Sequence, residues 1–174
     1  MTNPASSELQ HDAQAATLSR TRWAWVYATF FGVGYLPLGP GTWASAITVL
    51  WWYGLASLLP GTAQLPVALT LAAAFVLIGI PAGTKVCVEC GRVDPSHIVM
   101  DEVAGQMIAL LAVPHDWKYF LASFILFRLF DIIKPPPARQ FERLHGGTGV
   151  MLDDVMAGIY AAAVVHLLVY WRVL

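Results

Sequence analysis

Five carboxylates and two basic side chains lie within or beside apolar stretches in the later part of the chain. The bases are Arg128 and Lys134, and Asp131 lies between them, so three charges recur at intervals of three residues. This spacing places Arg128 and Asp131 on roughly one face of a helix. The other acids form two pairs, Asp101-Glu102 and Asp153-Asp154. A charge at the centre of a bilayer costs roughly 2.5–3.5 kcal/mol, so the pattern indicates a functional site.

Carboxylates clustered without Cys or His partners suit Mg²⁺ or Mn²⁺ rather than zinc. Mg²⁺ usually takes one or two carboxylates together with waters and phosphate oxygens, so not all the acids need be ligands. The guanidinium of Arg128 matches phosphate oxygens, and Lys134 adds a point charge beside it. The glycines of His145-Gly146-Gly147-Thr148-Gly149 allow backbone N–H groups to approach an anion. These residues predict a metal-dependent site for a phosphate on a lipid, with attack by metal-activated water favoured and an aspartyl-phosphate intermediate left open.

The composition indicates a membrane protein. The 174 residues amount to one domain, with 57% apolar and 12% charged residues, about half the charged fraction of an average soluble domain. No Asp, Glu, Lys, Arg or His occurs from Trp23 to Thr84. A bilayer can cover such a run, so we expect an integral membrane protein. The net charge of −1, without a basic stripe, gives no indication of nucleic-acid binding.

The expected fold is all-α: a single helical membrane domain over residues 23–174 that follows a disordered cytoplasmic tail at residues 1–22. An interfacial or re-entrant helix is expected at Trp23–Leu38, and Thr42 is a candidate N-cap for the next helix. Further helices are expected at Trp43–Leu59, Leu65–Gly83, Ile98–Val113, Trp117–Ile133 and Met151–Tyr170. The bundle therefore has about four to five apolar helices, several of them short for a core of roughly 30 Å.

The distribution of basic residues predicts the orientation in the membrane. With the tail inside, the cytoplasmic side receives Lys85, Arg92, Lys134, Arg139 and Arg143. The outer side receives only Lys118 and Arg172, in agreement with the positive-inside rule. All five carboxylates then lie near the cytoplasmic face, beside the Pro40-Gly41-Thr42 turn. This joint placement is the strongest argument from the residues for one polar site.

Each of these features also has a structural explanation. Asp101-Glu102 and Asp153-Asp154 begin predicted helices, where the helix dipole favours acids in any protein. Arg128 and Asp131 could form a structural ion pair between helices. Gly146-Gly147 could be an ordinary turn, and the lone pair Cys87 and Cys90 is expected to be reduced thiols, because a zinc site needs about four ligands.

Three rival functions fit part of the pattern. Phosphatidyltransferases resemble one another in a helix pattern, Asp-x-x-Asp-Gly-x-x-Ala-Arg. This pattern is absent from the chain. A small cation transporter would place the acids deep inside helices, whereas here they are expected near helix ends. A structural membrane subunit would use the charges only for pairing. A phosphatase is preferred, with a cation transporter or another lipid phosphate phosphatase as the alternative.

Three blocks of the sequence resemble the phosphatidylglycerophosphatase A family. They are Gly34–Ser45 with its Pro-Gly-Thr turn, Asp94–Gly105, and the stretch from Phe127-Arg128 to Gly158. Together they span about residues 30–162, most of the chain. One departure is Ala44, where members of the family often carry Gly.

The resemblance implies an Mg²⁺-dependent, all-helical enzyme of the bacterial inner membrane, multi-pass and with its site facing the cytoplasm. Its substrate would be phosphatidylglycerophosphate, hydrolysed to phosphatidylglycerol and phosphate. Residues matched for metal binding or water activation are Asp101, Glu102, Asp131, Asp153 and Asp154. Residues matched for the phosphate are Arg128 and Lys134, assisted by Thr42 and the backbone of Gly146 and Gly147. The general base, the number of metals, the oligomeric state and the selectivity for the lipid tail stay open.

Overall fold

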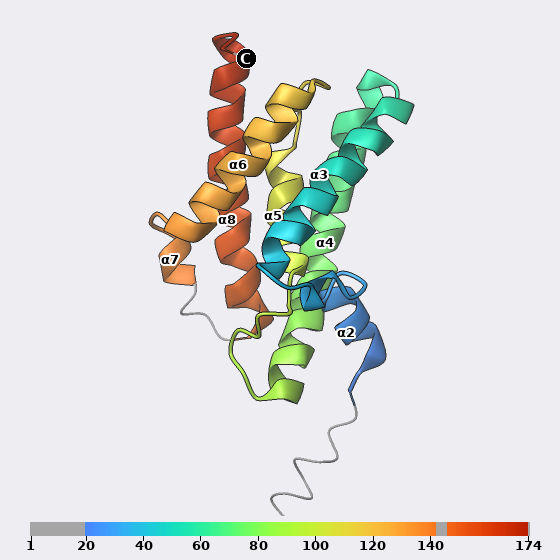
Figure 1. The fold of residues 1–174 in the computed structure, drawn as a ribbon, viewed down its shortest axis with the longest axis vertical. Coiled ribbons are helices and arrows are strands. Elements are labelled where there is room, and N and C mark those ends of the chain that lie inside the picture. The colour runs from blue at the N-terminus through green and yellow to red at the C-terminus, as the bar shows by residue number, and fades with distance from the viewer. Residues whose placement is uncertain (1–19, 142–145, 174) are drawn as a thin grey trace, which may run out of the picture.

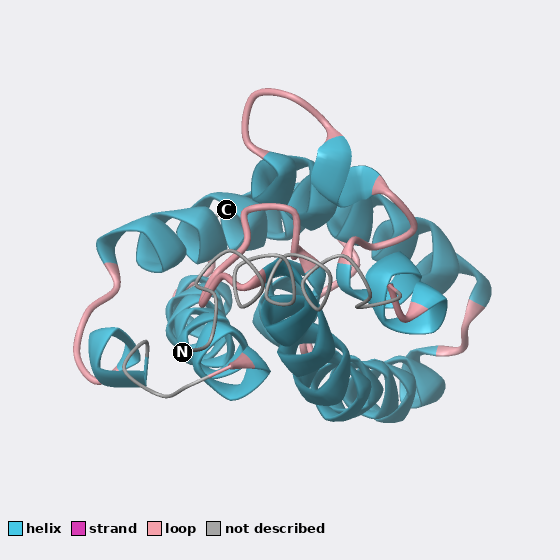
Figure 2. Ribbon diagram, turned by 90° about the horizontal axis from the view of Figure 1, so that it is seen from below, coloured by secondary structure: helices cyan, strands magenta, loops and turns pink. Residues whose placement is uncertain are grey.

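The computed structural model describes residues 20–141 and 146–173 of the chain (Figure 1). Within these ranges it contains seven α-helices, a short 3-10 helix and no strand, which confirms the all-α fold (Figure 2). The elements are α2 (Arg22–Ala28), η1 (Val33–Tyr35), α3 (Pro40–Leu58), α4 (Gly61–Cys90), α5 (Met100–Ala109), α6 (Trp117–Ile133), α7 (Ala138–Phe141) and α8 (Gly147–Tyr170). Most of the predicted tail, up to residue 19, lies outside the described residues.

The short helix α5 lies at the centre of the bundle and contacts α3, α4, α6 and α8. Eight of its ten residues are buried. Ten residues extend about 15 Å, half of a bilayer core of roughly 30 Å. The expected span Ile98–Val113 is therefore wrong at both ends: α5 is a central helix enclosed by protein. Buried residues on every side are typical of such a helix, and apolar side chains from Val103 onward made it resemble a membrane span.

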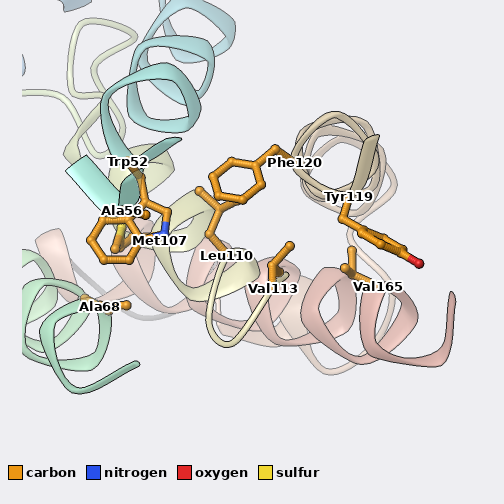
Figure 3. Packing of buried hydrophobic residues seen from close by; sticks show 10 residues of the cluster. Trp52, Ala56, Ala68, Met107, Leu110, Val113, Tyr119, Phe120 and Val165 are labelled. Atoms are coloured by element: carbon orange, nitrogen blue, oxygen red, sulfur yellow. The ribbon is translucent and has the colours of Figure 1, made fainter. Parts of the chain in front are cut away.

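Side chains from five helices form the largest apolar cluster, around the second half of α5 (Figure 3). Trp52 of α3, Met107 of α5 and Phe120 of α6 are each at most 3% exposed. Ala68 of α4 and Val165 of α8 complete the contact between the helices. This cluster holds the five helices together around the C-terminal half of α5. Asp101 and Glu102 lie at the opposite, N-terminal end of the same helix.

Helices α4 and α8 are the two in the described part of the chain that are long and apolar enough to cross a bilayer. Large apolar side chains also cover the outside of the bundle, such as Leu50 at 72% and Leu77 at 71% exposure. Apolar surface on this scale is typical of membrane association.

Two predicted boundaries near the N-terminus are wrong. The segment Trp23–Leu38 is not one helix: α2 ends at Ala28, and the chain then turns through Phe30 and Phe31, which have positive φ angles, before η1. Helix α3 begins at Pro40 with Gly39 as its N-cap, so Thr42 lies inside the first turn and is not the cap. Proline is well suited to the first helical position because its missing N–H would have no intrahelical partner there.

Helix α4 continues well beyond the predicted end at Gly83, so Lys85 and Glu89 lie in the helix rather than in a loop. Glu89 accepts hydrogen bonds from the backbone of Thr21 and from the indole N–H of Trp25, which ties the end of α4 to α2. The helix ends at Gly91, whose φ of +66° suits a helix C-terminus.

Helices α5 and α8 lie close together at two glycines. A Cβ atom on Gly105 would collide with the carbonyl oxygen of Asp154 and the ring of Phe127. A Cβ atom on Gly158 would collide with the carbonyl oxygen of Gly105. The small residues of α8 therefore serve helix packing. Since Asp101 and Asp154 each precede one of these glycines by four residues, the contact brings the two carboxylates together one helical turn away.

We predict that Gly158→Leu destabilises the protein by about 1–3 kcal/mol, because the added side chain must separate the backbones of α5 and α8. Thermal unfolding in detergent measures the effect. Ala163→Leu, on the exposed side of the same helix, is the matched control and leaves the midpoint nearly unchanged. Equal unfolding midpoints for Gly158→Leu and Ala163→Leu would contradict the close contact between α5 and α8.

Candidate active site

The charged residues singled out from the sequence meet in one pocket of about 250 Å³. Its walls come from the start of α3, the loop before α5, the first turn of α5, the first eight residues of α8, and the end of α6. The lining includes all five carboxylates and both bases: Asp101, Glu102, Asp131, Asp153, Asp154, Arg128 and Lys134. Segments that are far apart in the sequence thus supply one polar site.

Both bases of the pocket lie against carboxylates. Lys134 Nζ donates a hydrogen bond to Asp153 Oδ2 at 2.7 Å. Arg128 Nη1 lies 2.7 Å from Asp131 Oδ2 and 4.0 Å from Glu102 Oε1. The approach of Arg128 to Asp131 is a close charge contact without good hydrogen-bond geometry, because Nη1 and Nε of Arg128 make no hydrogen bond among the described residues. The guanidinium thus keeps donors for a further acceptor.

The three other carboxylates, those of Asp101, Glu102 and Asp154, form a tight group. One oxygen of each lies within 4.8 Å of the others, and Asp101 and Asp154 are 7% and 3% exposed. No ion pair to Asp101 or Asp154 occurs in the described part of the chain. Asp101 Oδ1 and Glu102 Oε2 are buried without a hydrogen-bond partner. Buried charges are normally paired or bind a metal, so this group fits a hard divalent cation such as Mg²⁺.

The helix dipole does not explain the acids of α8. Helix α8 begins at Gly147 rather than at Met151, so Asp153 and Asp154 are its seventh and eighth residues. Only the first four backbone N–H groups of a helix lack an intrahelical acceptor. Asp101 and Glu102 do lie in the first turn of α5. The dipole can therefore account for the acidic pair of α5 and not for the pair of α8.

Sequence reasoning missed Gly41 and chose its neighbour Thr42 instead. Gly39, Pro40 and Gly41 line the pocket, whereas Thr42 is exposed and is not part of the lining. A Cβ atom on Gly41 would collide with the carboxylate of Glu102, so only glycine leaves this side chain in place. The signal in the sequence was the tripeptide Gly39-Pro40-Gly41. It marks a close backbone approach as well as a turn.

The glycines before α8 do not line the pocket. The N–H of Gly147 donates to Thr84 Oγ1 at 3.1 Å, and a Cβ atom on Gly147 would collide with the carbonyl oxygen of Ile80. Gly147 therefore serves the packing of α8 against α4. The expectation that Gly146 and Gly147 help to bind an anion gains no support from this geometry, and His145 lies outside the described residues.

The loop before α5 adds Asp94 and Ser96 to the lining, which sequence reasoning did not single out as site residues. His97 anchors this loop between the rings of Trp25 and Tyr35, with centroid separations of 5.1 and 5.7 Å. Burial between the rings lowers the pKa of His97, so the imidazole stays neutral. These contacts give His97 a structural role in the loop.

The cysteines of α4 take no part in the pocket. Cys87 and Cys90 are free, and neither contributes to the lining. The thiol of Cys87 contacts the carbonyl oxygen of Val93 in the turn that follows the helix. Their arrangement agrees with the expectation of ordinary reduced thiols.

We predict opposite stability effects for the two adjacent acids of α8 in protein treated with EDTA. Asp154→Asn removes one of three crowded negative charges and should stabilise the fold by about 1–2 kcal/mol. Asp153→Asn removes the carboxylate that accepts from Lys134 and should destabilise the fold by about 1–3 kcal/mol. Thermal unfolding of both variants checks the signs. A loss of stability in Asp154→Asn would show that its charge is already balanced within the protein.

Comparison with known proteins agrees with this arrangement. The family model for phosphatidylglycerophosphatase A matches residues 26–169. The chain is 41% identical over 146 residues to phosphatidylglycerophosphatase A of Haemophilus influenzae, covering 83% of this chain and 87% of the relative. The corresponding protein of Escherichia coli is 37% identical over 145 residues, with 80% and 79% covered.

A relative from Bacteroides thetaiotaomicron carries a different name, "Putative phosphatidylinositol-3-phosphatase". It is 44% identical over 136 residues, which cover 76% of this chain and 85% of the relative. No solved structure matches the chain. The family match extends from α2 to the last turn of α8 and includes every charged residue of the pocket, so the chain belongs to the phosphatidylglycerophosphatase A family.

Proposed function

We propose that the protein is an Mg²⁺-dependent phosphatidylglycerophosphatase, which hydrolyses the terminal phosphate of phosphatidylglycerophosphate to give phosphatidylglycerol and phosphate. One observation carries the proposal. A single pocket contains three crowded carboxylates of the kind that bind a divalent cation, together with Arg128 and Lys134, which suit phosphate oxygens. The two relatives named phosphatidylglycerophosphatase A support the choice of lipid.

The residues of the pocket divide into two groups in this proposal. Asp101, Glu102 and Asp154 would hold Mg²⁺, which when bound neutralises phosphate charge and makes a water more acidic. Arg128 and Lys134 bind the oxygens of the terminal phosphate. In the first turn of α3 the N–H groups of Thr42 and Trp43 donate to the carbonyl oxygen of Gly39, which leaves the N–H of Gly41 for an anion at this end of the pocket.

Asp131 and Asp153 were matched as metal ligands, but we assign them first to holding Arg128 and Lys134. A carboxylate beside each base keeps it extended into the pocket before the lipid arrives. The attacking water must lose a proton and the departing glycerol oxygen must gain one. All five acids are near enough to take part, and the choice among them stays open.

We place the enzyme in the bacterial inner membrane, as a multi-pass protein with the pocket toward the cytoplasm. Helices α4 and α8 supply candidate spans, and the relatives come from bacteria. Arg22 begins α2, Lys85 lies near the end of α4 and Arg92 follows that end; these ends of α2 and α4 lie at the lower end of the molecule in Figure 1. Helices α3, α5 and α8 begin toward the same end, so the pocket would share the side on which the positive-inside rule places these basic residues.

Phosphatidylinositol 3-phosphate is a second candidate substrate, because the Bacteroides relative is named for it. Both lipids present a phosphate monoester on a sugar-like or glycerol headgroup. A cation transporter is less well supported, since two bases among the acids favour an anionic ligand.

We predict that purified protein in detergent releases phosphate from phosphatidylglycerophosphate with Mg²⁺ and loses this activity in excess EDTA. Asp101→Asn should lower kcat by about a thousandfold or more, because it removes a carboxylate from the metal group. Asp116→Asn is the control, since Asn caps a helix as well as Asp and Asp116 caps α6 away from the pocket. Parallel assays with phosphatidylinositol 3-phosphate separate the two substrates, and folded protein that hydrolyses neither lipid would contradict the proposal.

We also predict that Gly41→Ala lowers kcat/KM by about ten- to a hundredfold, because the new methyl group displaces the carboxylate of Glu102. Thermal stability should be kept or raised, since Ala favours a helix more than Gly does. Thr42→Ala is the neighbouring control and should change kcat/KM little. A larger loss of kcat/KM in Thr42→Ala than in Gly41→Ala would restore Thr42 as the substrate-binding residue matched from the sequence.

A further inference from the structure

An apolar groove of about 400 Å³ lies between α3 and α6, separate from the acidic pocket. Aliphatic and aromatic side chains form its walls. Ala46, Leu50 and Tyr53 line it from α3, and Phe120, Leu121 and Phe124 line it from α6. Leu50 is 72% and Leu121 47% exposed, so the groove opens sideways on the surface of the bundle.

The same two helices connect the groove to the pocket. Helix α3 begins at the pocket with Gly41, and α6 ends there with Asp131, so the helices run in opposite directions from it (Figure 1). Ala46 follows Gly41 by five residues, and Phe124 precedes Asp131 by seven, which corresponds to about 8–10 Å along the helices. The groove thus begins about two turns from the pocket and continues away from it.

We infer that this groove holds an acyl chain of the lipid whose phosphate occupies the acidic pocket. The inference rests on the proposed function and adds to it the place of the lipid tail. A phospholipid has a charged headgroup at one end and acyl chains at the other, and the α3–α6 pair presents matching surfaces in that order. With the pocket at the membrane face, the groove lies at the depth of the acyl chains and opens toward the bilayer.

A second apolar groove, on the other side of α3, is a less suitable place for the chain. It is lined by Phe31, Trp51 and Leu71, among others, from the α2–η1 turn, α3, α4 and α5. Helix α4 contributes no residue to the acidic pocket. In the α3–α6 groove both walls belong to helices that also line the pocket, whereas the second groove takes part of its lining from α4 and the α2–η1 turn.

The test compares phosphatidylglycerophosphate with long acyl chains and the same headgroup on very short chains, in Mg²⁺ and detergent. Each buried methylene strengthens binding by about three- to fourfold, so the wild type should prefer the long-chain lipid in kcat/KM. Ala46→Trp and Leu121→Trp each fill the groove and should lower the ratio of long-chain to short-chain kcat/KM by about tenfold or more. Ala163→Trp, on the exposed side of α8, is the matched control and keeps the wild-type ratio.

Any of the following results would overturn the inference. The ratio of long-chain to short-chain kcat/KM could stay at its wild-type value in both groove variants, whether their activity is kept or falls equally with both lipids. Leu71→Trp, in the second groove, could lower the ratio as much as Ala46→Trp does. Ala46→Trp could convert a dimer to a monomer at constant ratio, which would make the groove a contact between copies. A wild type that releases phosphate from neither lipid would instead remove the proposed function itself.

Discussion

The contact between Gly105 and Gly158 is the constraint on which the pocket depends. Because neither glycine has a side chain, the backbones of α5 and α8 meet, and the carboxylates one turn earlier are forced together. Asp101 and Asp154 are thereby buried within a few ångströms of each other and of Glu102. The same apolar contacts that build the core hold three like charges in place. The fold therefore stores an electrostatic cost that a bound cation can relieve.

The balance of charge around this contact separates two kinds of acid. Five carboxylates face two bases, which lie closest to Asp131 and Asp153, and Arg128 also approaches Glu102 at 4.0 Å. The carboxylates outnumber the bases by three, and Asp101 and Asp154 have no ion pair among the described residues. Arg128 and Lys134 keep the site from repelling an anionic lipid. A pocket of acids alone would attract the metal and exclude the phosphate, so both signs are needed on one surface.

The sequence predicted more accurately which residues meet in the pocket than where the helices that carry them begin and end. The predicted bounds of α6, Trp117–Ile133, are confirmed, because Asp116 caps its start and Pro135 follows its end. The start of α8 was placed four residues late, since the glycines read as a turn although Gly147 packs on α4. That error made the helix dipole a plausible explanation of Asp153 and Asp154. Only tertiary contacts, invisible in a single sequence, correct it.

Helix α5 shows why membrane depth could not be derived from composition. Its apolar residues made it resemble a span, but the helix has only ten residues and is enclosed by protein. A central helix that ends inside the bundle needs neighbours on every side. The first turns of α3 and α8 and the last turns of α6 therefore converge on its N-terminal end. That convergence creates a polar pocket at one end of α5, and in the proposed function the α3–α6 groove is the path by which an acyl chain can stay in the membrane while its headgroup reacts.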